Sequence, residues 1–472
     1  MSELLIPSRY EALEKIKNKE SFSHFIEEVK DAIEGIKEIY SDMATSGQGA
    51  FLIMHGKSGV GKTTFLHTLH LFLDNIDIVT IQNDESIEEE LLELKETAYA
   101  MRIVVIEGRE AIKDSSNEEI ESSLHRINNF IRSKTGNKNL VVWLCNKKEM
   151  RETLIEIAND IGAESLLGLY KEYLVYEGPE KKKFLKIAQN TVSTINEGSS
   201  LLSLGITEDQ AKSMIEDDDT IGKYLTKIRK LSQKNTKSIK KLVGKERCRM
   251  WIIVIAGNDP IKDVAALTSG SNALADIERL MVATESNIIQ EIKAHSEKIG
   301  KLSSFFECRI LHLSTLAITS IIRTYSDDTL KEKLKQSKFE TKIDKNAKDN
   351  LLKSQLGKAF EDESIGMGKK GAKIGNNTIA SFEKLAYIAR SNDTILNGSL
   401  AKALIDSEMI DSYEIESNFG SGLKRRTDIL CTTSDSPIRL EIMWRKSTSQ
   451  AEIANYTLSK LYNYGKAIGL LD

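Results

Sequence analysis

The sequence has few prolines and cysteines, and it lacks long apolar runs. Only 4 prolines occur in 472 residues, which favours long helices because proline interrupts them. The 4 cysteines are scattered, without the paired spacing of a zinc site or a disulfide framework, so we expect a reduced, cytoplasmic protein without structural zinc. No apolar run approaches the roughly 20 residues that a membrane helix needs, and the first residues lack the pattern of a signal peptide. We therefore expect no membrane partner.

The composition is that of an ordinary globular protein with more than one domain. Hydrophobic residues make up 40% of the chain and charged residues 29%, and 472 residues exceed what one hydrophobic core usually organises. The formal net charge of -4 excludes no class of partner, because local runs of charge matter more than the total.

One stretch carries most of the functional information: the apolar run 51–54 leads into a glycine-rich turn. Gly56, Gly61, Lys62 and Thr63 have the spacing of a P-loop, in which glycines let backbone N–H groups surround a phosphate. The lysine reaches the β- and γ-phosphates, and the threonine hydroxyl holds Mg²⁺. We therefore expect ATP and Mg²⁺ as ligands, and the predicted nucleotide-binding residues are Gly56, Lys57, Ser58, Gly59, Val60, Gly61, Lys62, Thr63 and Thr64.

Apolar runs recur after this turn, separated by helical patterns. Helices are expected over 10–16 and 25–36, before the P-loop, and further strands at 76–81, 102–107, 139–146 and 173–179, with a helix over 183–188. Strands that alternate with helices predict a parallel sheet wrapped by helices, with ligands at the carboxyl ends of the strands.

Residues 24–230 resemble the AAA+ family and related signal-transducing ATPases. The resemblance rests on GKSGVGKTT, IVVIEGRE, the strand that ends at Asn146, and YLVYEGPEKKKFLKIA. It implies that Glu107, at the end of the third strand, binds Mg²⁺ and that Asn146 orients the attacking water. An asparagine also suits a turn that ends a strand, and the sequence leaves both roles of Asn146 open.

The third strand departs from the family's pattern, which ends in an acid for Mg²⁺ followed by a glutamate base. Here the strand ends Glu107-Gly108-Arg109-Glu110, so a glycine stands where the base is expected. Either Glu110, about one helical turn further on, serves as the base, or hydrolysis is slow. No arginine finger is evident, because Arg151 is the only arginine between the fourth and fifth predicted strands.

A basic stretch follows the expected ATPase core. From Lys223 to Arg249 the only acid is Glu246. A solvated helix face is the simplest interpretation of such a run, but its single sign in a slightly acidic protein favours contact with a phosphate backbone. DNA is therefore an expected partner.

The middle of the chain is predicted to be mostly helical. Residues 250–260 form a buried strand or the start of an apolar helix, and Asn258-Asp259-Pro260 suits a turn and helix cap better than a second catalytic site. The pattern over 261–356 is helical. The glycine-rich stretch 365–375 is expected to be a flexible linker or a DNA-facing loop, with a domain boundary nearby.

The end of the chain has a different pattern. A helix over 381–389, strands at 413–416, 427–431 and 439–444, and a helix that begins at Gln450 place Asp428 and Glu441 on neighbouring strands. Over residues 378–472 this order resembles the PD-(D/E)XK nuclease fold. The resemblance implies that Asp428 and Glu441 hold Mg²⁺ at a scissile phosphate, and that a lysine two residues after the second acid activates water.

The expected lysine is missing. Met443 stands in its place, and a thioether neither donates nor accepts a proton. Lys446 follows closely, but alternation puts it on the opposite face from Met443 if the strand continues. We therefore expect a nuclease-like domain with weak or absent cleavage.

The expected fold class is α/β, with a P-loop parallel-sheet ATPase core, a helical middle region and an α/β nuclease-like C-terminal domain. The expected ranges are N-terminal helices at 1–45, the core at 46–198, a helical lid and basic region at 199–364, and the nuclease-like domain at 378–472.

The expected function is ATP-controlled recognition of DNA by a homo-oligomer, in a microbial antiviral defence or mobile-element system and with a partner effector subunit. Two alternatives remain open. One is a nucleotide-driven oligomeric switch that acts through protein partners, and the other is an ATP-gated endonuclease.

Overall fold

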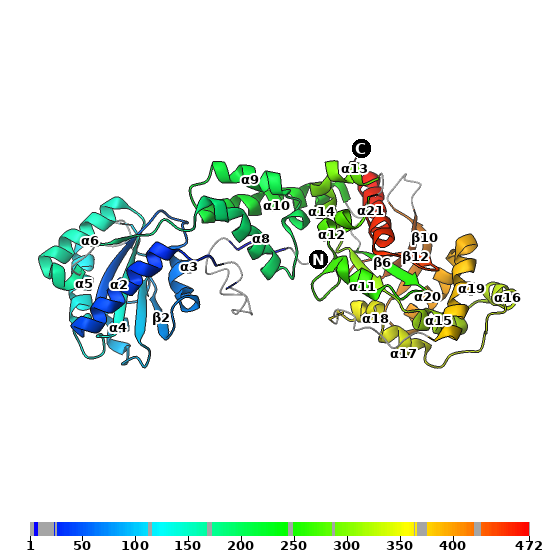
Figure 1. Ribbon diagram of the computed structural model, residues 1–472, viewed down its shortest axis with the longest axis horizontal. Helices are drawn as coiled ribbons and strands as arrows, with labels where there is room; N and C mark the ends of the chain where they lie inside the picture. Colours follow the sequence, from blue (N-terminus) through cyan, green and yellow to red (C-terminus); the bar gives the residue numbers. More distant parts are fainter. Residues whose placement is uncertain are drawn as a thin grey trace. The chain divides into compact units, whose positions relative to one another are not determined.

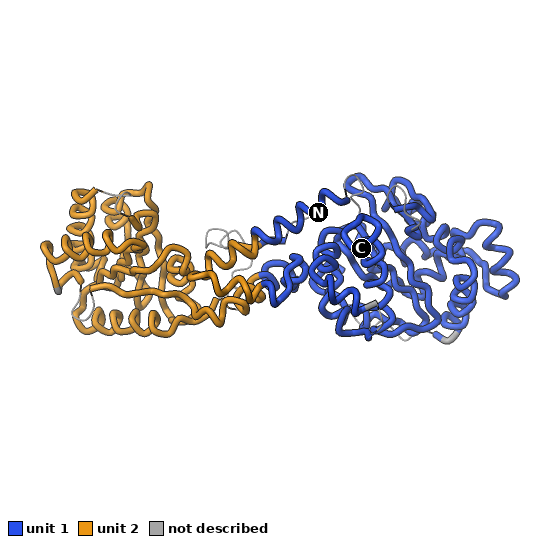
Figure 2. The backbone as a smooth tube through the Cα atoms, turned by 90° about the horizontal axis from the view of Figure 1, so that it is seen from above, with its two compact units in different colours: residues 1–5, 192–210, 230–472 blue, residues 6–191, 211–229 orange. Residues whose placement is uncertain are grey.

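The chain forms two compact units, which Figure 2 colours separately. The P-loop unit comprises residues 6–191 and 211–229, and the mixed-sheet unit comprises 1–5, 192–210 and 230–472. The structure is a computed structural model, and it describes residues 4–7, 23, 26–111, 116–167, 172–243, 249–285, 288–362, 364–365, 375–419 and 426–471. Within these ranges, none of the helices combines the length and the apolar character needed to cross a bilayer.

The P-loop unit is built on a five-stranded parallel sheet in the order β2-β3-β4-β1-β5. Figure 1 labels strand β2 of this sheet and several of the helices packed around it. Its strands are β1 (Ala50–His55), β2 (Ile76–Ile81), β3 (Met101–Ile106), β4 (Asn139–Cys145) and β5 (Leu174–Val175). Every neighbouring pair is parallel. The five predicted strands are confirmed, although the last is much shorter than expected.

Both faces of this sheet are covered, because its inner strands β3, β4 and β1 are mostly apolar and buried. All of β4 is buried, and separate apolar clusters lie on the two faces, as expected for a parallel sheet between helical layers. The helical segments are α2 (Lys30–Ser46), α3 (Lys62–His67), η2 (Leu69–Leu71), α4 (Ile87–Glu93), α5 (Asn117–Ile131), α6 (Lys148–Ile161), α7 (Glu164–Leu167), η4 (Lys181–Lys183) and α8 (Phe184–Ile195).

The mixed-sheet unit contains a seven-stranded sheet in the order β10-β11-β12-β6-β9-β8-β7. The strands are β6 (Arg249–Ala256), β7 (Thr268–Ser269), β8 (Leu274–Ala275), β9 (Arg309–His312), β10 (Ser412–Asn418), β11 (Arg426–Thr432) and β12 (Ile438–Arg445). The three central strands β12, β6 and β9 are parallel. The flanking pairs are antiparallel. The second sheet is therefore mixed, and the α/β fold class is confirmed.

Helices cover both faces of this sheet, each face with its own apolar cluster. The helical segments that follow α8 in the chain are η5 (Leu201–Leu204), α9 (Glu208–Glu216), α10 (Ile221–Val243), α11 (Ile261–Ala266), α12 (Ile277–Ala283), α13 (Ile288–Ala294), α14 (Ser296–Phe305), α15 (Thr315–Tyr325), α16 (Asp328–Gln336), α17 (Ala347–Leu352), α18 (Gln355–Phe360), α19 (Asn376–Asn392), α20 (Thr394–Asp406) and α21 (Gln450–Ala467). The division between the two units runs through α8, α9 and α10.

The division of the chain differs from the ranges that the sequence suggests. Strand β6 pairs with β12 along its whole length, from Arg249 opposite Ile438 to Ala256 opposite Arg445. Residues 199–364 and 378–472 therefore do not form separate domains, and the helical prediction over 261–356 missed strands β7, β8 and β9. The cause is that a short apolar run does not reveal its pairing partner. The predicted helix at 10–16 and most of the glycine-rich stretch, 366–374, lie outside the described residues.

Candidate functional site

The P-loop follows β1 and surrounds the side chain of Lys62. Gly59 and Gly61 adopt φ values of 86° and 100°, in the left-handed region that glycine tolerates best. The Lys62 ammonium donates hydrogen bonds to the Gly56 carbonyl and to Asn146 Oδ1, both at 2.6 Å. Burial lowers the pKa of Lys62 to about 8, although the charge of Glu110 acts in the opposite direction. The turn thus presents a buried lysine at the carboxyl end of a central strand.

Two neighbouring segments hold the turn closely. The Gly222 N–H, at the start of α10, donates to the Gly59 carbonyl at 2.9 Å. A side chain at Gly56 would collide with the Tyr176 carbonyl, and one at Gly178 with the Val60 carbonyl. Glycines are therefore required here by close packing as well as by backbone conformation.

The acids after β3 lie beside this turn. Glu107 Oε1 is 3.0 Å from His67 Nε2, and both side chains are mostly buried. The Glu110 carboxylate accepts a bond from the Gly108 N–H at 3.4 Å, and the Glu110 carbonyl accepts one from the Asn146 N–H at 3.1 Å. The ends of β3 and β4 are thus joined, and the structure brings the predicted residues Glu107, Glu110 and Asn146 to the same edge of the sheet as Lys62.

The remaining predicted residues occupy the turn and the first turn of α3. Val60 is buried in the apolar cluster, and Thr63 and Thr64 directly follow Lys62 in α3. The described residues contain no group of three side chains that could hold a metal ion on their own. Magnesium is usually held by one or two carboxylates together with substrate phosphates, so the hydroxyl of Thr63 and the carboxylate of Glu107 fit such an ion.

Two residues near the turn have roles that the sequence did not suggest. His67 lies in the last turn of α3 and also lies 3.3 Å from Thr80 Oγ1, so it fixes Glu107 against β2. Arg151 stacks on the Tyr173 ring, with its guanidinium carbon 4.4 Å from the ring centroid. A polar residue in the last turn of the helix after the P-loop is the only sequence signal that points to His67.

The basic stretch forms one face of α10. Tyr224, Ile228, Ile239 and Val243 are buried on its apolar face. Lys230, Lys234, Lys237 and Lys241 are exposed, and their spacing places them along one side of the helix. We call these four residues the lysine stripe. The rest of the basic stretch, 244–248, lies outside the described residues.

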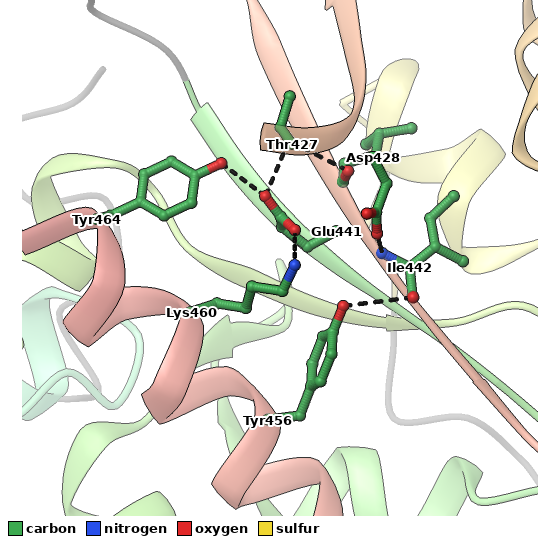
Figure 3. Close-up of polar contacts among 8 residues, drawn as sticks. Thr427, Asp428, Glu441, Ile442, Tyr456, Lys460 and Tyr464 are labelled. Carbon is green, nitrogen blue, oxygen red and sulfur yellow. Dashed lines mark hydrogen bonds and ion pairs between the residues drawn. The ribbon is translucent and has the colours of Figure 1, made fainter. Parts of the chain in front are cut away.

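In the mixed-sheet unit, Asp428 and Glu441 lie in a buried polar cluster (Figure 3). Asp428 Oδ2 accepts a hydrogen bond from the Ile442 N–H at 2.6 Å. Glu441 is fully buried and accepts bonds from Thr427 Oγ1 at 2.9 Å and the Tyr464 hydroxyl at 2.7 Å. Its second oxygen pairs with the ammonium of Lys460. We call Thr427, Asp428, Glu441, Lys460 and Tyr464 the carboxylate cluster.

The charged groups in this cluster shift one another's pKa values. Burial, with a further contribution from Glu441, raises the pKa of Asp428 to about 7. Burial lowers the pKa of Lys460, but the charges of Glu441, Tyr456 and Asp428 outweigh it and the net shift is upward. Lys460 is therefore a cation, while the proton on Asp428 is gained or lost near neutral pH.

Lys460 is the member of this cluster that the sequence did not predict. Tyr456, Lys460 and Tyr464 are four residues apart and lie on one face of α21, which points at the sheet (Figure 3). The sequence signal that pointed to Lys460 was its position between Tyr456 and Tyr464 on one face of a predicted helix. Lys446, which was considered as a replacement for the missing lysine, instead pairs with Glu383 at 2.9 Å on the surface.

The remaining residues considered from the sequence have structural surroundings. Met443 is buried in the apolar cluster on the face of the sheet that α21 covers. Asn258 joins the ends of β6 and β12, because its side chain accepts from the Thr448 N–H at 3.0 Å and donates to the Thr448 carbonyl at 2.7 Å. The turn predicted at 258–260 is present, and Pro260 caps α11 without a side-chain hydrogen bond.

Comparisons with known proteins give little further guidance. No protein-family model and no curated protein matches this chain. Among solved structures, the chain is similar to the RuvB Holliday junction branch migration motor of Thermotoga maritima, at 13% sequence identity and a TM-score of 0.25. The similarity covers 52% of this chain and 82% of the RuvB chain. A similarity this distant carries no information about ligands or activity.

Proposed function

We propose that this protein binds and hydrolyses ATP with Mg²⁺, and that the nucleotide controls its recognition of DNA as a homo-oligomer. The observation that carries the proposal is the P-loop at the carboxyl end of β1. Its buried lysine lies within hydrogen-bonding distance of Asn146, and Glu107 and Glu110 follow the strand two places along the sheet. A parallel five-stranded sheet is consistent with the P-loop ATPase core that the sequence predicts.

The assigned roles follow from the positions of these groups. Lys62 is the charged partner of the β- and γ-phosphates. Thr63 and Glu107 hold Mg²⁺, with His67 orienting Glu107, and Asn146 and Glu110 act on the attacking water. The absence of an acid directly after Glu107 favours slow hydrolysis, so the proposal requires nucleotide binding and does not require rapid turnover.

Nucleotide titration tests the first half of the proposal. Lys62→Ala removes the charge-assisted hydrogen bonds to the triphosphate, which are worth about 1.5–3 kcal/mol each. We expect calorimetry to show at least tenfold weaker ATP binding in Lys62→Ala. Lys57→Ala should keep most of the affinity, because it removes an exposed side chain and leaves the backbone N–H of the turn in place. Equal affinity of Lys62→Ala and the wild type would rule out this site.

DNA binding at several salt concentrations, with and without ATP, tests the second half. Because each phosphate contact releases counterions, the slope of log affinity against log salt should flatten by about one unit for each lost contact. We expect this when Lys234, Lys237 and Lys241 are changed to glutamate, and no change of slope when Lys331 and Lys335 of α16 are reversed. An unchanged slope in the stripe variant would make the lysine stripe an ordinary solvated face.

A second candidate function is metal-dependent cleavage of DNA at the carboxylate cluster. The observation that favours it is the pairing of Lys460 with Glu441, because it supplies the lysine that Met443 cannot. Competition for the oxygens of Glu441 weighs against high activity, because Lys460, Thr427 and Tyr464 already bond to them and would have to give way to a metal ion. Plasmid cleavage in Mg²⁺ is the test: activity lost in Lys460→Ala and kept in Lys446→Ala supports a nuclease, and no cleavage by the wild type excludes it.

A further inference from the structure

Two arginines at the amino ends of two central strands have buried N–H groups without hydrogen-bond acceptors among the described residues. Arg249 opens β6 and Arg309 opens β9. Trp251 is the register partner of Arg309 and lies two residues after Arg249, so all three side chains project from the same face of the sheet. Glu441 pairs in register with Ile252 and projects from the other face, which separates these arginines from the carboxylate cluster.

Both guanidinium groups lie against one indole ring. Their central carbons are 5.6 Å and 5.0 Å from the centroid of the Trp251 ring. The Phe360 ring meets Trp251 edge-on at 4.9 Å. These contacts partly stabilise each positive charge, since a cation is attracted to an aromatic ring. They leave the N–H groups of the guanidinium unbonded, because these donors need acceptor oxygens.

The N–H groups of this cluster are largely unpaired. Four buried nitrogens have no hydrogen-bond partner in the described part of the chain, namely Arg249 Nε, Arg309 Nε, Arg309 Nη1 and Trp251 Nε1. Arg309 is only 4% exposed. A buried donor left unpaired is destabilising, and such groups commonly mark a bound ion or water.

The local charge is positive, and the cluster reaches solvent. The Arg309 guanidinium pairs with Glu307, and its next acid is the largely exposed Asp362 at 3.9 Å. Arg249 has no acidic partner among the described residues and is partly exposed. The charge of Arg249 thus has no acidic partner among the described residues, and the cluster borders solvent at this residue.

We infer that Arg249, Arg309 and Trp251 form a binding site for a phosphate group. A planar guanidinium offers two parallel donors to an oxyanion, and the two arginines and the indole approach from different strand positions. A carboxylate, with two oxygens in one plane, satisfies one such fork. A phosphate monoester has three terminal oxygens in a tetrahedral arrangement and a charge of about −2, so it suits several converging donors.

The test uses the full chain carrying Lys62→Ala, which disables the P-loop and separates this inference from the proposed ATPase. Calorimetric titration with inorganic phosphate at constant ionic strength should show saturable binding. Arg249→Met should weaken it about tenfold or more, because one charge-assisted fork is lost. Arg323→Met is the matched control, because Arg323 also lies 5.6 Å from an aromatic ring but has Glu340 as its acceptor. Absence of phosphate binding, or equal binding by Arg249→Met, overturns the inference.

A second arm identifies the source of the phosphate. Tighter binding of a 5′-phosphorylated oligonucleotide than of its 5′-hydroxyl counterpart, with the difference lost in Arg249→Met, assigns the site to a nucleic acid terminus. Equal binding of the two assigns it to free phosphate or a small phosphate ester. If Arg249→Met does not fold, mass spectrometry after phenylglyoxal treatment replaces it: phosphate should slow the modification of Arg249 but not of Arg323, and equal rates overturn the inference.

Discussion

Replacing Lys460 by methionine tests whether the carboxylate cluster depends on its single ammonium group. The Glu441 side chain is 0% exposed and that of Lys460 is 23% exposed. Removing one partner of a buried ion pair typically costs about 3–5 kcal/mol, because the other charge stays buried and unpaired. Since Thr427 and Tyr464 still donate to Glu441, we expect the lower end, about 3 kcal/mol.

Urea unfolding of the mixed-sheet unit measures this loss. Trp251 and Trp444 report on that unit and Trp143 lies in the other, so the measurement is made in a Trp143→Phe background. With a urea dependence of about 3 kcal/mol per molar, the midpoint should fall by about 1 M at pH 7.5.

Two further variants decide between electrostatics and packing. Glu441→Gln in the Lys460→Met background removes the unpaired charge and should restore most of the stability. Lys446→Met breaks only a surface pair and should cost about 0–1 kcal/mol. If Lys460→Met costs no more than Lys446→Met, or Glu441→Gln restores none of the lost stability, the ion pair does not hold this cluster together.

Two other predictions concern single carboxylates. Glu110→Gln should slow ATP hydrolysis by about 10²–10⁴-fold if Glu110 is the general base, with ATP still bound; hydrolysis at the wild-type rate would exclude this role. Asp428→Asn should flatten the dependence of stability on pH. The folded state raises the pKa of Asp428 from 3.8 to about 7, so this carboxyl contributes stability that is complete below pH 3.8 and is lost as the pH rises through 7. Parallel stability curves for the variant and the wild type over this range would contradict the shift.

The sequence predicted the P-loop unit well because its signals are local. Strands β1, β3 and β4 are mostly apolar runs followed closely by Gly56, Glu107 and Asn146. Lys62 lies in a turn of fixed spacing. Family resemblance made Asn146 a candidate, but its contact with Lys62 was not predicted from the sequence. The link between His67 and Glu107 joins residues 40 apart, and no periodicity in the sequence specifies it.

The mixed-sheet unit was predicted in pieces. Strands β10, β11 and β12 and helix α21 follow from alternation and helical spacing. That β6 belongs to the same sheet as β12 cannot be predicted in this way, because an apolar strand is compatible with many partners and β12 lies far along the chain. Strand β9 has four residues, which is too short for a clear pattern. Lys460 reaches Glu441 from a helix packed on the sheet, and that packing is decided by the whole unit.

The pairing of β6 with β12 affects how the chain can be made. About 180 residues separate the two strands, so translation at about 5–20 residues per second leaves one edge of β6 without its partner for on the order of 10–40 s. Seven of its eight residues are buried in the finished sheet. During synthesis this is an open apolar strand edge, the kind of surface that pairs with other chains. We expect fragments that end before residue 438 to aggregate, and the yield of soluble full-length protein to rise when synthesis is slowed in the cold.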